Sequence, residues 1–132
     1  MTPVVIDASA GVELAADTMR GRALRGLLAT DSVPWVPDHF FVECGAVLRR
    51  WELNAVLPAD DIVSAMAELK AWPLRVAQVR GLLDDAWRLR FNLTVADALY
   101  VVLAEHLDAK VLTDDGHLVN APGLPVGTLH LS

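Results

Sequence analysis

The segment VVIDASAG (residues 4–11) joins a run of β-branched apolar residues to an aspartate and a series of small residues. Val4, Val5 and Ile6 form a short uninterrupted apolar run, which is typical of a strand buried on both faces. The small residues after Asp7 suit a tight turn, and the apolar spacing over residues 10–16 is helical. The segment therefore predicts a buried strand followed by a helix, with Asp7 at the carboxyl end of the strand.

The rest of the chain repeats this alternation of short apolar strands and helices. Further strands are expected over residues 33–36, 74–78, 110–113 and 126–131, and further helices over residues 18–30, 38–54, 57–72, 80–90 and 95–107. Asp38 and Thr94 are the expected N-caps of two of these helices. The alternation predicts an α/β sandwich with a largely parallel sheet.

Length and composition restrict the class of protein further. The chain has 132 residues, of which 54% are hydrophobic, and its formal net charge is -6. This length suits one domain, residues 1–132, whose core needs neither disulfides nor a structural metal, and the composition excludes intrinsic disorder. The acidic balance argues against non-specific coating of nucleic acid, yet it is compatible with a nuclease whose acids gather in one metal site.

Features that mark cell compartment are few. Cys44 is the only cysteine, so no internal disulfide is expected, and a reducing cytoplasm is the default location. The N-terminal residues lack a basic leader, and no apolar run of about 18 residues occurs. We therefore expect a cytoplasmic protein without a signal peptide or a membrane span.

Four carboxylates are expected to meet at one edge of the sheet. Asp7 and Asp115 follow parallel strands, while Glu43 and Asp97 lie among apolar residues near the N-termini of helices that begin at that edge. Two like charges about 4 Å apart repel by roughly 4 kcal/mol at an effective dielectric of 20, so a cation is needed between them. Oxygen-only ligands select Mg²⁺ or Mn²⁺, which support hydrolytic phosphoryl transfer.

Each acid also has an ordinary structural explanation. Asp7 is a suitable N-cap for the following helix, and Glu43 and Asp97 complement helix dipoles. Asp114 and Asp115 before a glycine are typical of a turn. It is the joint occurrence of the acids at positions that the fold sends to one edge that favours a metal site.

Three stretches of the sequence share their order and spacing with a known family. They are VVIDASAGVEL (residues 4–14), HFFVECGAVLRR (residues 39–50) and LTVADALYVVLAEHLDAKVLTDDGHL (residues 93–118). Together they resemble the PIN domain, and within it the VapC toxins of prokaryotic VapBC toxin–antitoxin systems. The resemblance spans essentially the whole chain and implies a PIN-like three-layer α/β/α sandwich with a short, largely parallel central sheet.

The resemblance also implies roles for particular residues. Asp7, Glu43, Asp97 and Asp115 correspond to the acidic quartet that binds Mg²⁺ or Mn²⁺ and carries catalysis. Ser9 and Thr113 correspond to hydroxyl positions that support the carboxylates or a bound water, whereas Asp114 is an extra acid with no assigned role.

Proteins similar to this one are metal-dependent endoribonucleases that cut structured RNA such as tRNA or rRNA and so arrest translation. The resemblance therefore implies an RNA substrate, a homodimer, and inhibition by a cognate VapB-type antitoxin whose C-terminal segment covers the active site. With the antitoxin, a heterotetramer or a larger assembly is expected.

The remaining notable residues are interpreted more plainly. The four histidines (His39, His106, His117 and His130) lack metal-ligand spacing and are interpreted as surface or cap residues, and Cys44 as a core residue. The tryptophans are expected in the core or at interfaces, including a groove for an antitoxin helix. Arginines at positions 20, 22, 25, 49, 50, 88 and 90 either line a path for the RNA backbone or are ordinary helix-terminal charges.

Two other functions compete with a nuclease. One is a PIN-like module that binds RNA or a partner without cutting, which the loss of an acid would favour; all four acids are present. The other is a phosphate-accepting receiver domain. That fold normally has an adjacent acidic pair after its first strand and a lysine after its last, and this chain has neither.

Overall fold

A five-stranded parallel sheet forms the centre of the computed structural model, which describes residues 1–131. Its strands are β1 (Thr2–Ile6), β2 (Ser32–Pro37), β3 (Arg75–Ala77), β4 (Lys110–Leu112) and β5 (Thr128–Leu129), in the order β3-β2-β1-β4-β5. Every neighbouring pair is parallel. The expected α/β sandwich is therefore confirmed, and the first strand of the chain occupies the middle of the sheet.

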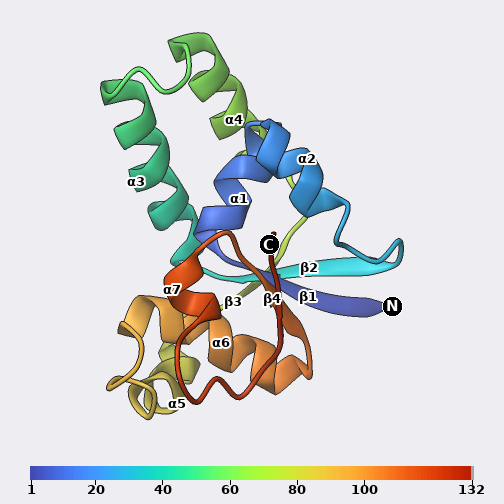
Figure 1. The fold of residues 1–132 in the computed structure, drawn as a ribbon, viewed down its shortest axis with the longest axis vertical. Helices are drawn as coiled ribbons and strands as arrows, with labels where there is room; N and C mark the ends of the chain where they lie inside the picture. Colours follow the sequence, from blue (N-terminus) through green and yellow to red (C-terminus); the bar gives the residue numbers. More distant parts are fainter. Residues whose placement is uncertain (132) are drawn as a thin grey trace.

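Helices cover both faces of this sheet and complete three layers (Figure 1). One layer contains α1 (Ala8–Ala15), α2 (Met19–Arg25), α3 (Phe40–Leu53) and α4 (Ala59–Ala71). The other contains α5 (Leu83–Trp87), preceded by a 3₁₀ turn at Val79–Leu82, and α6 (Val95–Leu107). A short helix, α7 (Gly116–Val119), follows β4, and α3 and α4 form a hairpin that projects away from the sheet.

The core fills both faces of the central strands, against α6 on one face and against α1, α3 and α4 on the other. Val5 and Ile6 of β1 and Val111 and Leu112 of β4 are fully buried, as the continuous apolar runs at these positions predict. Seven consecutive residues of α6, Ala98 to Ala104, are buried, because α5 and the sheet pack against different sides of this helix. Close packing of this kind holds the N-terminal turn of α6 in a defined place.

A glycine brings α1 and α3 together. A methyl group added at Gly11 would lie 2.5 Å from the ring of Phe40, which leaves no room for any side chain on this turn of α1. Phe40 opens α3, and Glu43 follows it by one turn. The close approach therefore carries Glu43 toward Asp7, the residue that precedes α1.

Several sequence-based predictions of the elements are confirmed. The helix over residues 95–107 has the expected bounds, and Thr94 caps it, since its hydroxyl accepts a hydrogen bond from the backbone N–H of Asp97. The predicted break between two helices at Asp17 and Thr18 is present, with Asp17 in the left-handed region at φ 51°.

Other predictions of the elements are wrong in detail. His39, not Asp38, is the N-cap of α3, because the Asp38 carboxylate accepts a hydrogen bond from the backbone N–H of Val79 instead. The helix expected over residues 18–30 ends at Arg25. The backbone N–H groups of Leu27 and Leu28 then donate to the carbonyls three residues before them, as in a 3₁₀ turn. The final strand is shorter than residues 126–131, and α7 replaces an expected turn.

Three of the four tryptophans, Trp35, Trp51 and Trp72, pack against the core, whereas Trp87 is 57% exposed. Each helix within residues 1–131 is too short or too polar to cross a lipid bilayer.

Candidate active site

A pocket of about 200 Å³ at the carboxyl edge of the sheet gathers the four carboxylates singled out in the sequence. Asp7 ends β1 and Asp115 follows β4, while Glu43 comes from α3 and Asp97 from the first turn of α6. Its remaining lining residues are Ala8, Ser9, Ala46, Val47, Arg50 and Tyr100. Four segments that are distant in sequence therefore deliver carboxylates to one small space.

Asp7 is the most buried of these acids, with 4% of its surface exposed. Its Oδ1 accepts hydrogen bonds from the Ser9 hydroxyl at 2.7 Å and the Ala10 backbone N–H at 3.0 Å, and its Oδ2 accepts one from the Thr113 hydroxyl. Burial raises the pKa of Asp7 to about 6 although these hydrogen bonds oppose the shift, and the charge of Asp115 adds to it. Asp7 thus caps α1 and lines the pocket at the same time.

The hydroxyls of Ser9 and Thr113 tie α1 to the end of β4. The Ser9 hydroxyl oxygen also accepts a hydrogen bond from the backbone N–H of Asp114 at 2.8 Å. The Thr113 hydroxyl oxygen accepts one from the backbone N–H of Asp115 at 3.0 Å. Because both hydroxyls donate to Asp7, they limit the rotation of its carboxylate and couple it to the loop that carries Asp115.

Glu43 contacts two residues that the sequence analysis did not assign to the site. The Tyr100 hydroxyl donates to Glu43 Oε1 at 2.6 Å. His39 Nε2 lies 3.4 Å from the same oxygen, while its hydrogen bond, at 2.9 Å, is with the backbone carbonyl of Ala96. Burial and the neighbouring Glu43 carboxylate raise the pKa of Tyr100, so its hydroxyl stays protonated and remains a donor. The His39 ring is half-buried against Tyr100, with ring centroids 4.8 Å apart, and His39 is the N-cap of α3, one of the two roles expected for the histidines.

Helical spacing was the available signal for these two residues. Tyr100 follows Asp97 by one turn of α6, and His39 precedes Glu43 by one turn of α3, so each pair shares a helix face. In the sequence, Tyr100 is indistinguishable from the apolar stripe around it.

Asp97 and Asp115 influence each other across the pocket. The pKa of Asp97 is raised mainly by burial and then by the charge of Asp115, with a smaller contribution from Glu43; the Thr94 hydrogen bond and His39 oppose the shift. The Asp115 Oδ1 accepts a hydrogen bond from the backbone N–H of His117 at 2.9 Å and so caps α7. The pocket therefore holds more negative charge than its own residues neutralise.

Asp114 has a different environment from its neighbour Asp115. Its two oxygens accept hydrogen bonds from Arg20 Nε at 2.8 Å and Arg20 Nη2 at 2.5 Å. It does not line the acidic pocket but an adjoining one, with Arg20, Asn120 and His130. The extra acid of the sequence thus joins α2 to the end of β4.

The four carboxylates share the pocket without forming a compact cluster. Among residues 1–131, no three Asp, Glu, His or Cys side chains are arranged closely enough to hold a metal ion as they stand. Like charges favour separation, and the oxygens of Asp7, Glu43 and Asp115 accept hydrogen bonds from the chain's own donors. The donor chemistry nevertheless fits a hard divalent cation, because Mg²⁺ and Mn²⁺ prefer carboxylate oxygens.

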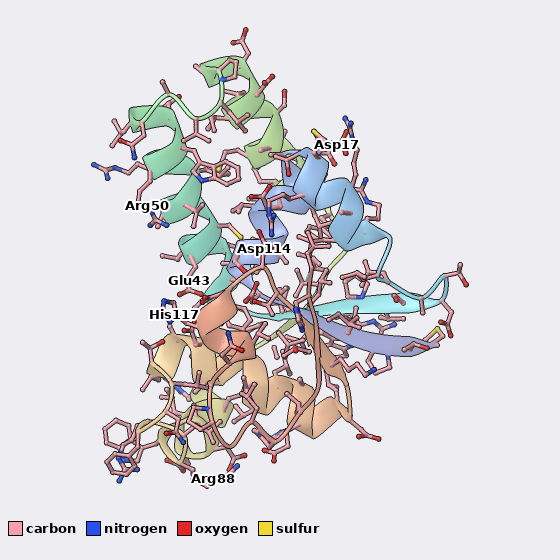
Figure 2. The ribbon with its side chains drawn as sticks, viewed as in Figure 1. Asp17, Glu43, Arg50, Arg88, Asp114 and His117 are labelled. Atoms are coloured by element: carbon pink, nitrogen blue, oxygen red, sulfur yellow. The ribbon has the colours of Figure 1, made fainter. Side chains whose placement is uncertain are left out.

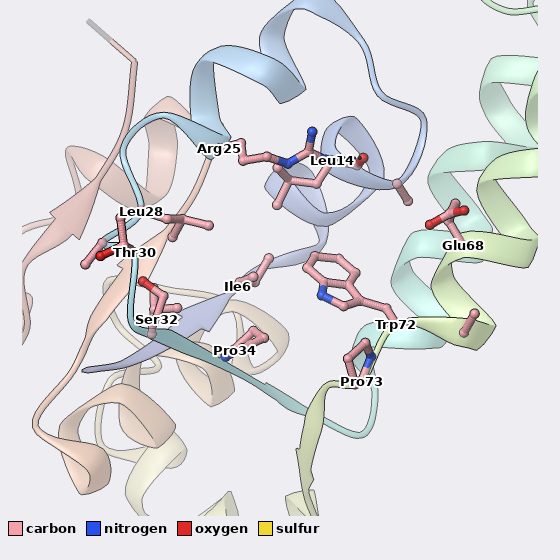
Figure 3. Close-up of a pocket in the computed structure, with 14 residues that line it drawn as sticks. Ile6, Leu14, Arg25, Leu28, Thr30, Ser32, Pro34, Glu68, Trp72 and Pro73 are labelled. Carbon is pink, nitrogen blue, oxygen red and sulfur yellow. Dashed lines mark hydrogen bonds between the residues drawn. The ribbon is translucent and has the colours of Figure 1, made fainter. Parts of the chain in front are cut away.

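A separate, larger cavity lies away from these carboxylates (Figure 3). Its volume is about 560 Å³, and it lies between the sheet, α1 and the C-terminal end of α4. Apolar side chains supply most of its lining, among them Ile6, Leu14, Leu28, Pro34 and Trp72. Arg25 and Glu68 lie at two sides of it and carry opposite charges.

A parallel α/β sandwich with four carboxylates at the carboxyl edge of its sheet is the arrangement that the sequence resemblance implied. The family model described as PIN domain matches residues 4–124. The chain therefore belongs to the PIN-domain family.

Relatives that match nearly the whole chain show which group of the family it belongs to. The chain is 39% identical over 130 residues to Ribonuclease VapC1 of Mycobacterium tuberculosis, a match that covers 95% of each protein. It thus belongs to the VapC group of PIN-domain proteins.

Solved structures support the same fold. Mycobacterium tuberculosis VapC20, described as a sarcin-ricin loop cleaving toxin, superposes with a TM-score of 0.64 at 19% identity, covering 87% of this chain and 92% of that one. VapBC2 from Rickettsia felis, bound to a DNA fragment from its promoter, gives a TM-score of 0.62 at 10% identity, covering 99% of this chain and 100% of that one. These likenesses establish the fold.

Proposed function

We propose that this protein is a metal-dependent endoribonuclease and the toxin component of a VapBC-type toxin–antitoxin system. The observation that carries the proposal is the pocket in which Asp7, Glu43, Asp97 and Asp115 converge from four segments. The chain is 39% identical to Ribonuclease VapC1 over nearly its whole length, which supports the same chemistry. The reaction is hydrolysis of phosphodiester bonds in RNA, with tRNA or rRNA as substrate and inhibition of translation and growth as the result.

The proposed cofactor is Mg²⁺, with Mn²⁺ as a substitute, and the four pocket carboxylates are its proposed ligands. When bound, the ion supplies Lewis acidity toward a phosphodiester oxygen and lowers the pKa of its water. Burial is the main cause of the raised pKa values of Asp7 and Asp97, and the charge of Asp115 adds to both shifts; a cation among the four carboxylates would offset this repulsion.

The chain's own residues position these carboxylates. Ser9 and Thr113 hold the Asp7 carboxylate by hydrogen bonds, and Tyr100 holds Oε1 of Glu43. Since Asp7 and Glu43 are both restrained from rotating freely, the entropy lost on binding a cation is reduced. The hydroxyls and Tyr100 are therefore positioning residues.

Cleavage of total cellular RNA by purified, antitoxin-free protein tests the proposal. Reactions contain Mg²⁺, Mn²⁺ or EDTA, and Asp97→Asn runs beside the wild type. Discrete fragments that require metal and disappear in the variant support the nuclease. Cleavage that persists in EDTA contradicts metal dependence, and metal binding without cleavage favours a non-cleaving RNA- or partner-binding module.

The proposed inhibitory partner is a VapB-type antitoxin, and the apolar cavity at Trp72 is its proposed docking site. The structural likeness to VapBC2 supports a complex of this kind. An amphipathic segment fits the cavity, since Ile6, Leu14 and Trp72 offer apolar contacts and Arg25 and Glu68 offer one charge of each sign. Trp72→Ala should weaken the complex with the cognate antitoxin in a titration and leave cleavage by the free protein unchanged; equal affinity contradicts the site.

We further propose a cytoplasmic homodimer that forms a heterotetramer or a larger assembly with the antitoxin. The lone thiol, Cys44, is buried, and burial raises its pKa, which suits a protein that needs no disulfide. Light scattering on the purified protein, with and without antitoxin, measures both masses. A monomeric free protein contradicts the homodimer.

A further inference from the structure

One face of α3 forms a wall of the acidic pocket. Glu43, Ala46, Val47 and Arg50 all line the pocket, and their spacing of three and four residues puts them on one face of the helix. Figure 2 shows Glu43 and Arg50 along the same side of α3. Arg49, the residue before Arg50, is not part of this wall.

Arg50 is the basic residue among those that line the pocket. Its side chain is exposed and forms no ion pair with any residue in the described part of the chain. Arg50 follows Glu43 by seven positions, a rise of about 10 Å along the helix, which explains why the two do not pair. By contrast, Arg20, Arg22, Arg25 and Arg88 each pair with an acid.

We propose that Arg50 binds a phosphate of the RNA strand next to the phosphodiester that is cut. The inference rests on the proposed function, because it assigns the substrate of the same pocket. Four carboxylates repel a polyanion, and one divalent cation offsets only part of their charge. A guanidinium at the rim attracts the strand and binds a phosphate with two parallel hydrogen bonds.

The part of the α3 face between Glu43 and Arg50 is suited to contact with the RNA strand. Ala46 and Val47 lie between Glu43 and Arg50 and present small apolar side chains to the pocket. They offer no competing charge, so a strand that runs from the carboxylates along α3 reaches Arg50 at a phosphate close to the one that is cut. The proposed substrate path thus follows this face of α3 across the site.

The test compares Arg50 with its neighbour Arg49, which is also exposed and basic. Binding of labelled bulk tRNA is measured in an Asp97→Asn background, which separates binding from cleavage, at several salt concentrations with Mg²⁺ present. We expect Arg50→Gln to weaken binding about five- to tenfold and to lower the salt slope by about one. Arg49→Gln should change the Kd less than about twofold, and Arg50→Lys should fall between the two.

Cleavage by the same substitutions in an otherwise wild-type chain supplies the second measurement. Arg50→Gln should raise KM and leave kcat nearly unchanged, because the contact is made in the ground state and the transition state alike. Equal effects of Arg49→Gln and Arg50→Gln on binding and KM overturn the inference while the nuclease stands. The other outcome is that Arg50→Gln weakens tRNA binding, Arg49→Gln does not, and the wild-type protein cuts no RNA. That result overturns the nuclease while the phosphate contact stands.

Discussion

The acids of the pocket and the acids around α2 carry the same charge in opposite surroundings. Asp17 accepts hydrogen bonds from Arg22 and Arg25, and the Arg22 guanidinium lowers the pKa of Asp17. Among residues 1–131, Asp7 has no basic partner, and burial raises its pKa to about 6. The chain therefore neutralises its acids in one region and leaves them uncompensated in the other.

This difference distinguishes the acids that pair with arginines in the fold from the acids that we propose bind a metal ion. Asp114 and Asp115 are neighbours, yet Asp114 pairs with Arg20 while Asp115 faces Asp7 and Asp97 across the pocket. Burying like charges together destabilises a fold, so a stability argument does not account for the pocket. The proposed cation would account for it, because it would convert repulsion into attraction.

The largest expected effect is on cleavage. Asp97→Asn should lower RNA cleavage by at least about 100-fold, because it removes one of four carboxylates and keeps the side-chain size. Asp17→Asn, in the paired region, should leave cleavage unchanged. Fragment yield against time in Mg²⁺ measures both, and equal losses in the two variants would erase the distinction between the regions.

The next effect is on the stability of the metal-free protein. Asp7→Asn should raise the free energy of unfolding in EDTA at pH 7.5 by about 1 to 3 kcal/mol, because it removes a buried charge. The folded-state pKa of Asp7, about 6, lies above 3.8, the ordinary value of an aspartate, so the folded state binds the proton more tightly than the unfolded state does. The wild type should therefore lose stability relative to the variant as pH rises from about 4 to 6.

Urea unfolding at several pH values measures this difference. The gap between variant and wild type should be small at pH 4, widen through pH 6 and remain constant above pH 7. A gap that is already complete at pH 4 would show that Asn acts through packing or hydrogen bonding and not through charge.

A smaller effect is expected from the groups that position the acids. Tyr100→Phe removes the hydrogen bond to Glu43 but keeps the buried ring, so Mn²⁺ affinity should fall about tenfold. Calorimetric titration measures it, and the thermal midpoint of the metal-free protein serves as the control. Unchanged affinity would mean that Glu43 does not need Tyr100 for its orientation.

The smallest effect should come from the paired acid beside the pocket. Asp114→Asn breaks an exposed ion pair with Arg20, so cleavage should stay within about twofold of wild type and the thermal midpoint should fall slightly. The same assays apply. A loss of cleavage comparable to that of Asp97→Asn would instead place Asp114 among the functional acids.

Local patterns in the sequence predicted most of the elements and the acids of interest. The apolar run before Asp7, the capping residue Thr94 and the stripe of α6 are determined by neighbours in the chain, so periodicity identifies them. α7 was not predicted, because four residues are too few to establish a helical period. The expected cap at Asp38 failed because a hydrogen bond to Val79, 41 residues away, competes for that carboxylate.

Sequence by itself determined the parallel α/β class, the acids at strand ends and their helix-borne partners, and the resemblance to PIN domains, since each depends on short-range pattern. Only the tertiary structure decided that Tyr100 contacts Glu43, that Arg20 pairs with Asp114, and that Arg50 and not Arg49 lines the pocket. These contacts join residues from different elements or separate adjacent residues by helix face. Their energies depend on distance in space, which the order of residues along the chain does not specify until the elements have packed.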